Sequence, residues 1–105
     1  LLTTEALADF HANPSGTWLT HHAAREVYTF LGCPEKIAIN FRPGGHEHGA
    51  DGFSTLLDFA DEVFFDKKIV TQRDWNPNQF PDAAKGHSWK APVAVDATRP
   101  AAQGR

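Results

Sequence analysis

The first 66 residues alternate between two kinds of apolar pattern, and this alternation restricts the fold more than any other feature. A short run of apolar and threonine residues, Leu1 to Leu7, predicts a buried strand. Lys36 to Phe41 predicts a second strand, because it is β-branched and aromatic, flanked by prolines and too short for a helix. A loop and a helical pattern follow each strand. This order predicts an α/β fold with parallel strands, right-handed crossovers and helices that cover the sheet.

The two helices are expected over about Thr17 to Leu31 and about Phe53 to Phe65, where apolar residues recur at three- and four-residue steps. The stripe of the first helix consists of Leu19, Ala23, Val27, Phe30 and Leu31, and that of the second of Phe53, Leu56, Leu57, Ala60, Val63 and Phe64.

Local signals indicate where the helices begin and end. Turn-forming pairs make the segment 9–16 a loop, after which Ser15 or Thr17 is the expected cap. Gly32 stands where a left-handed C-terminal cap belongs, and Asp51 is the expected cap of the second helix.

The periodicity ends after Asp66, and the sequence divides there into 1–66, the strand–helix–strand–helix portion, and 67–105, an extended tail. The tail has no apolar stripe but holds Trp75, Phe80 and Trp89, which would expose a large apolar area if they were unpacked. We therefore expect the tail to lie along the body to about residue 95 and to be mobile beyond it.

Composition excludes several classes of function. A chain of 105 residues allows one domain, and a net charge of −3 argues against binding to nucleic acid. No apolar run approaches the length of about 18 residues that a membrane helix needs. The one cysteine, Cys33, excludes an internal disulfide. It follows a helix C-terminus, which disfavours a thiolate, so we expect a small buried residue beside the strand rather than a nucleophile.

Two loops carry the residues best suited to chemistry. Asp9 follows the first strand, with His11 close by in the sequence, and His46 lies in the glycine-rich loop 42–52 after the second strand. Reacting groups of parallel α/β sheets lie at the carboxyl ends of the strands, so Asp9 and His46 should project from the same edge. A carboxylate on Nδ1 of an imidazole fixes the tautomer and leaves Nε2 free as a general base.

Two alternatives stand beside this hypothesis. His46 and His48, flanked by Glu47 and Asp51, are zinc-type ligands, although no third ligand comes at an expected spacing. The neighbouring pair His21 and His22 points in directions about 100° apart on a helix, so we expect surface residues there. The other alternative is a small α/β interaction module without chemistry of its own.

None of the serines, Ser15, Ser54 and Ser88, lies in the Gly-x-Ser-x-Gly arrangement of a nucleophile elbow. A serine hydrolase that used this chain would therefore take its nucleophile and oxyanion hole from elsewhere. The chain has no methionine and begins within a strand-like run, which indicates a C-terminal piece of a larger protein. Alone it should fold poorly, with Leu1, Leu2, Ile37 and Ile39 on open edges, and it should not hydrolyse esters.

A family resemblance supports the hydrolase hypothesis. The segment 9–65 resembles the C-terminal end of an α/β-hydrolase, and in particular the glucuronoyl-esterase-like and acetyl-xylan-esterase-like carbohydrate esterases of bacteria. The stretches that carry the resemblance are Ala12-Asn13-Pro14 with Trp18, Ala23 to Tyr28 with Leu31-Gly32, Arg42-Pro43-Gly44-Gly45-His46, and Leu57-Asp58-Phe59-Ala60-Asp61; Ser88 to Pro92 in the tail extends it.

The resemblance implies a serine esterase that acts on a small-molecule or polysaccharide ester without a cofactor or metal. His46 is then the triad histidine and Asp9 the acid, unless the acid is a glutamate one strand earlier, outside this chain. The residues that grip the substrate also lie upstream in the family, and Trp18 and Trp75 could border a sugar site. Enzymes of this kind are usually exported, which implies a secreted or periplasmic protein.

Overall fold

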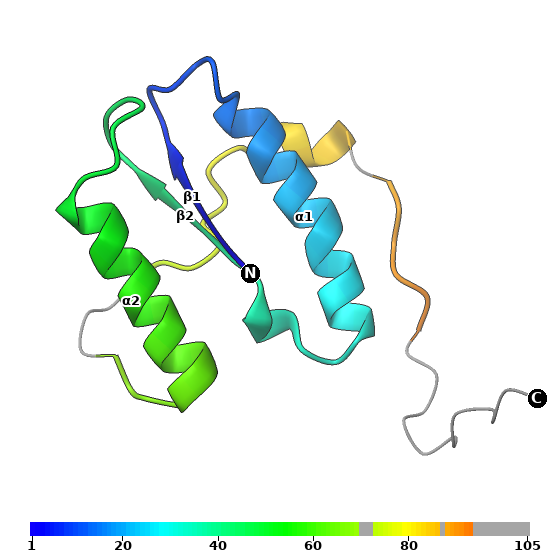
Figure 1. Cartoon of the computed structure of the whole chain (residues 1–105). Coiled ribbons are helices and arrows are strands. Elements are labelled where there is room, and N and C mark those ends of the chain that lie inside the picture. Colours follow the sequence, from blue (N-terminus) through cyan, green and yellow to red (C-terminus); the bar gives the residue numbers. More distant parts are fainter. Residues whose placement is uncertain (70–72, 87, 94–105) are drawn as a thin grey trace, which may run out of the picture.

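The structure is a computed structural model that describes residues 1–69, 73–86 and 88–93 (Figure 1). Its elements are β1 (Leu2–Ala6), α1 (Pro14–Phe30), a 3-10 helix (Pro34–Lys36), β2 (Ala38–Arg42), α2 (Ala50–Phe65) and a second 3-10 helix (Ala83–Gly86). β1 and β2 pair in parallel, with Leu2 opposite Ala38 and Ala6 opposite Arg42. In Figure 1 the strands run between α1 and α2. The expected α/β arrangement of two parallel strands and two helices is confirmed.

The beginning of α1 differs from the expectation. The helix starts at Pro14 rather than Thr17, and Asn13 is its cap, with φ 54° and a side-chain oxygen that accepts the Gly16 N–H at 3.2 Å. The expected cap by Ser15 or Thr17 is wrong, because both residues already lie in the helix. Proline suits the first helical position, since its missing N–H would have no partner there.

The other boundaries shift by a few residues. At the end of α1, Gly32 has φ 74° and its N–H bonds to the Thr29 carbonyl at 3.0 Å, which confirms the left-handed cap. Lys36 belongs to the 3-10 helix rather than to β2. α2 begins at Ala50, three residues before the expected start, and Gly49 caps it without a side-chain bond. The expectation of an Asp51 cap is wrong; Asp51 lies in the first turn, where its charge still favours the helix dipole.

The core lies around β2. Ile37 and Ile39 are 1% and 0% exposed, and they are buried together with Ala6, Trp18, Ala38 and Phe59. The expectation that Ile37 and Ile39 would be left on an open edge is therefore wrong, whereas Leu1 is 62% exposed.

Hydrogen bonds from the tail cover the middle of the β2 edge that does not pair with β1. The backbone N–H of Asn76 donates to the Ile39 carbonyl at 2.9 Å, and the Asn76 side-chain oxygen accepts the Ile39 N–H at 3.1 Å. Next to it, the Trp18 indole donates to the Pro77 carbonyl at 2.9 Å. The segment around Asn76, yellow in Figure 1, thus covers the edge of β2 at Ile39.

The aromatic residues of the tail pack unequally. Trp75 and Phe80 are half-buried, as expected, while Trp89 is 48% exposed. The 3-10 helix Ala83–Gly86 was not expected from the sequence, and it lies beside α1 (Figure 1). The mobility expected beyond residue 95 concerns residues outside the described part of the chain, and the division at residue 66 stays a prediction.

Neither helix buries most of its expected stripe. α1 buries Pro14, Trp18 and His21, and α2 buries Gly52, Thr55 and Phe59. Several residues of the stripes face solvent instead: Val27, Leu31, Phe53, Leu56, Leu57 and Phe64. α2 therefore presents an apolar face to solvent. In the part of the chain that the structure describes, neither helix is long and apolar enough to cross a bilayer.

Candidate functional site

Asp9 and His46 follow the carboxyl ends of the two strands. Asp9 lies in a tight turn after β1, in which its N–H donates to the Ala6 carbonyl at 3.2 Å. His46 lies in the loop between β2 and α2. Because the strands are parallel, both loops emerge at one end of the sheet, and the distance from His46 Nδ1 to Asp9 Oδ2 is 2.8 Å. The expected proximity of the two side chains is confirmed, and their catalytic role stays a prediction.

The two partners differ in their exposure to solvent. The Asp9 side chain is 9% exposed, whereas the His46 side chain is 93% exposed. The hydrogen bond from His46 holds the pKa of Asp9 below its ordinary value of 3.8, and the Ala12 N–H, 3.4 Å from Oδ1, lowers this pKa further, while burial acts in the opposite direction. Asp9 is therefore a buried carboxylate that is ionised at neutral pH.

This contact determines the chemistry of the imidazole. An ionised carboxylate accepts hydrogen bonds only, so the shared proton belongs to His46 Nδ1. In the neutral ring, Nε2 then carries the lone pair. Among the described residues Nε2 makes no hydrogen bond to protein, and the exposed ring leaves it accessible to a reacting group. The arrangement can accept a proton at Nε2 and stabilise the resulting imidazolium through Asp9.

Backbone bonds fix the loop that carries His46. The Ala8 N–H donates to the Gly44 carbonyl at 3.0 Å, and the Arg42 guanidinium donates to the Gly45 carbonyl at 3.0 Å. Gly44 has φ 93°, a conformation that glycine adopts without strain. The loop is thus tied to the turn that holds Asp9, and His46 is aimed at Asp9 by backbone as well as by side-chain contacts.

His48 anchors the far end of this loop. Its Nε2 lies 2.9 Å from the Thr4 hydroxyl of β1, and its ring packs against Phe53, with 5.2 Å between the ring centroids. A Cβ on Gly52 would approach the His48 ring to 2.5 Å, so a larger residue here would force the ring to move. Sequence reasoning missed Thr4 and Gly52. Neither had a local signal in the sequence, because the Gly52 contact depends on how the His48 ring packs and Thr4 meets the loop only through the tertiary fold.

The metal hypothesis receives no support from the geometry. His46 and His48 bind different partners, Asp9 and Thr4. Within 1–69, 73–86 and 88–93 there is no group of three or more His, Cys, Asp or Glu residues that could hold an ion.

The second histidine pair also differs from the expectation. His21 is 7% exposed, and its Nε2 lies 2.8 Å from the Asn76 side-chain oxygen. Burial lowers the pKa of His21 below its ordinary value of 6.5. His22 stacks on Trp18, with 5.1 Å between the ring centroids. The expected surface position is therefore wrong for His21, which belongs to the packing between α1 and the tail.

The other residues that the sequence analysis singled out are the serines, Cys33 and Trp18. Ser15 lies in α1, Ser54 in α2 accepts a bond from Arg73 at 2.8 Å, and no described serine bonds to His46. Cys33 is only half-buried and precedes the 3-10 helix. Trp18 is buried at 6% exposure, as a packing residue would be, and whether it borders a sugar site stays a prediction.

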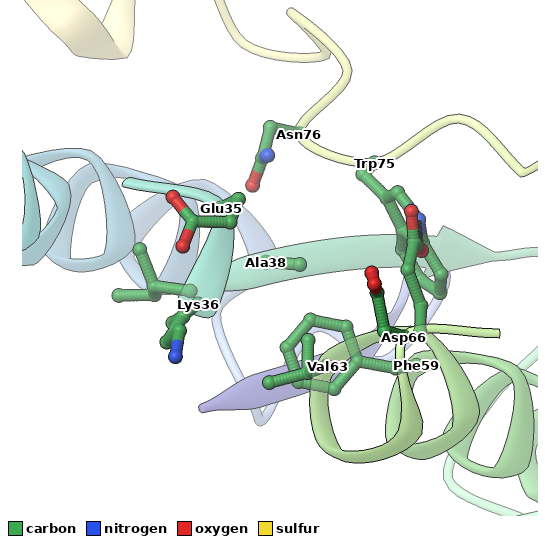
Figure 2. Close-up of a pocket in the computed structure, with 10 residues that line it drawn as sticks. Glu35, Lys36, Ala38, Phe59, Val63, Asp66, Trp75 and Asn76 are labelled. Carbon is green, nitrogen blue, oxygen red and sulfur yellow. Dashed lines mark hydrogen bonds between the residues drawn. The ribbon is translucent and has the colours of Figure 1, made fainter. Parts of the chain in front are cut away.

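A cavity of about 490 Å³ lies at the opposite end of the strands from His46, where β2 begins (Figure 2). It is therefore separate from the Asp9–His46 pair.

In comparisons with protein-family models, with curated proteins and with solved structures, no match to this chain was found.

Proposed function

We propose that this chain is the C-terminal portion of a serine carboxylic-ester hydrolase, in which His46 is the general base and Asp9 the acid that orients it. The observation that carries the proposal is the 2.8 Å contact from His46 Nδ1 to the buried Asp9 carboxylate, between loops at the carboxyl ends of adjacent parallel strands. A structural histidine is usually covered. Here the carboxylate is covered and the imidazole is open, as proton transfer to a substrate requires.

The mechanism is two-step ester cleavage. His46 Nε2 removes the proton of a serine hydroxyl as the serine oxygen attacks the ester carbonyl, and then donates that proton to the leaving alcohol. In the second step it removes a proton from water, which attacks the acyl-enzyme, and returns the proton to the serine oxygen as the acid leaves. Asp9 stays ionised throughout and stabilises the imidazolium. The serine and the oxyanion hole come from outside this chain.

The substrate class rests on the resemblance to carbohydrate esterases. We propose glucuronoyl or acetyl esters of plant polysaccharide as substrates, and a secreted or periplasmic location. The position of Asp9 favours it over an upstream glutamate as the triad acid, because its Oδ2 already occupies the hydrogen-bonding position on Nδ1.

A non-catalytic interaction module is the second candidate. The exposed apolar face of α2, with Phe53, Leu57 and Phe64 at 58%, 66% and 75% exposure, favours packing against further protein. A hydrolase domain that extends beyond this chain would use the same face, so activity has to discriminate between the two candidates.

The test replaces the two loop histidines separately in the full-length protein. His46→Ala should lower the kcat for a simple aryl ester by several orders of magnitude, because the general base is lost. His48→Ala is the matched control and should lower kcat only about tenfold, because it removes an anchor of the loop but leaves the base in place. If His48→Ala abolishes turnover and His46→Ala does not, the base is His48. If the full-length protein and both variants all lack esterase activity, the interaction module is the better account.

A further inference from the structure

The cavity at the amino end of β2 has walls from three parts of the chain (Figure 2). Ala38 of β2 forms one wall, Phe59 and Val63 of α2 form another, and Trp75 and Asn76 of the tail form the third. The Trp75 ring is held in place by an edge contact with Phe59, with 5.6 Å between the centroids. A volume of about 490 Å³ lies within the range of about 300–1,000 Å³ that is typical of small-molecule sites.

Acidic groups surround this apolar space. Glu35, Glu62 and Asp66 line it, against one basic residue, Lys36. In Figure 2 the Asp66 carboxylate lies beside the space in front of Ala38, while the Glu35 carboxylate and the Lys36 ammonium point away from it. Neither Glu35 nor Asp66 has a side-chain hydrogen bond or ion pair to another described residue.

Two further features make the cavity favourable for positive charge. Glu62 accepts a hydrogen bond from the Trp75 indole at 3.0 Å, which orients the ring and places a third carboxylate beside it. α2 ends at Phe65, next to Asp66, so the negative end of the helix dipole lies at the same place. An indole face attracts cations as well.

We propose that this cavity binds a small organic cation, an ammonium group carried on an apolar body. The body packs against Phe59, Val63 and the Trp75 ring, and the ammonium lies beside Asp66 and Glu62, with Glu35 adding negative charge at the rim. The site is independent of the proposed hydrolase function, because it lies at the other end of the strands from Asp9 and His46.

Titration calorimetry of the full-length protein tests the charge preference with three ligands of similar size. The probe is 2-phenylethylammonium, and the comparison ligands are the neutral 3-phenylpropanamide and the anionic 3-phenylpropionate. We expect the cation to bind at least tenfold more tightly than either comparison ligand, with the difference reduced by salt. No cation binding at 10 mM, or equal affinity for the three ligands, would overturn the proposal.

Matched substitutions then locate the site. Asp66→Asn should weaken binding of the cation about 3- to 10-fold, and asparagine tolerates the φ of 52° at this position. Glu35→Gln, at an exposed position, should act in the same direction. Asp82→Asn removes the same charge from an exposed tail residue that does not line the cavity, and should leave the affinity unchanged. Equal weakening by Asp82→Asn would mean that only net charge matters, and would contradict a site in this cavity.

Discussion

Two histidines make hydrogen bonds of the same length in surroundings that differ completely. His46 Nδ1 lies 2.8 Å from a carboxylate, and His21 Nε2 lies 2.8 Å from an amide oxygen. The His46 ring is open to solvent, whereas His21 Nδ1 is buried and has no hydrogen-bond partner among the residues that the structure describes. The length of the hydrogen bond alone therefore does not identify a functional histidine. The charge of the partner and the access to the second nitrogen distinguish a potential base from a packing residue.

The largest expected effect is a loss of activity when Asp9, the charged partner of His46, is replaced. Under the proposed function, Asp9→Asn in the full-length protein should lower kcat by about 10⁴-fold, because a neutral amide neither stabilises the imidazolium nor enforces the Nδ1–H tautomer. The measurement is steady-state hydrolysis of an aryl ester. Glu47→Gln, which removes a charge from the same loop, should leave kcat within about a factor of three. Full activity of Asp9→Asn would make an upstream glutamate the acid.

The hydrogen-bonded pair of His21 and Asn76, in which neither side chain is charged, should affect the stability of the fold rather than activity. Asn76→Gly removes the side-chain bonds to Ile39 and His21 but accommodates the φ of 62°, and should cost about 1–3 kcal/mol of unfolding free energy. Urea unfolding followed by circular dichroism measures this loss.

Asn78→Gly is the control, because Asn78 is exposed and its substitution should change the free energy of unfolding by less than about 0.5 kcal/mol. Equal losses from both substitutions would mean that Asn76 does not hold the tail on β2.

A smaller effect should come from the anchor of the His46 loop. Gly52→Ala places a methyl group against the His48 ring and should displace it from Thr4. We expect kcat to fall about tenfold, since small misplacements of a catalytic group are costly. Gly49→Ala, where an added Cβ meets nothing within 4 Å, is the matched control. An unchanged kcat in Gly52→Ala would show that His48 does not position the loop.

The smallest effect is a pH dependence of stability. Burial lowers the pKa of His21, so the unfolded chain binds more protons than the folded chain below about pH 6.5. Arg25 and His22 on the same helix lower this pKa further, while the bond to Asn76 raises it. The contribution of His21 is complete above about pH 6.5 and is progressively lost as the pH falls below that value. His21→Gln should flatten this part of the stability curve, and an unchanged slope would contradict a buried neutral His21.

The sequence predicted the parts of the fold that depend on local pattern. The parallel strands and both helices follow from apolar periodicity, and Gly32 from its place after α1. The Asn13 cap was missed because turn-forming pairs predict a loop through residue 16, although proline is well suited to a first helical position. The helix faces were misjudged for a different reason: apolar stripes predict that a face packs, but not against which partner.

For the candidate site, strand order was sufficient to bring Asp9 and His46 together, since parallel strands place successive loops at one end of the sheet. The roles of Thr4, Gly52 and Asn76 could not be predicted. Each contacts residues that are distant in sequence or depends on a side-chain packing that no periodicity encodes.

The tautomer of the His46 ring tests the central claim most directly. Nitrogen NMR of the full-length protein labelled at histidine, at a pH where the ring is neutral, distinguishes a protonated ring nitrogen from an unprotonated one. We predict a proton on Nδ1 and a bare Nε2, with this preference lost in Asp9→Asn. A proton on Nε2, or a tautomer that does not change when Asp9 is replaced, would contradict the account.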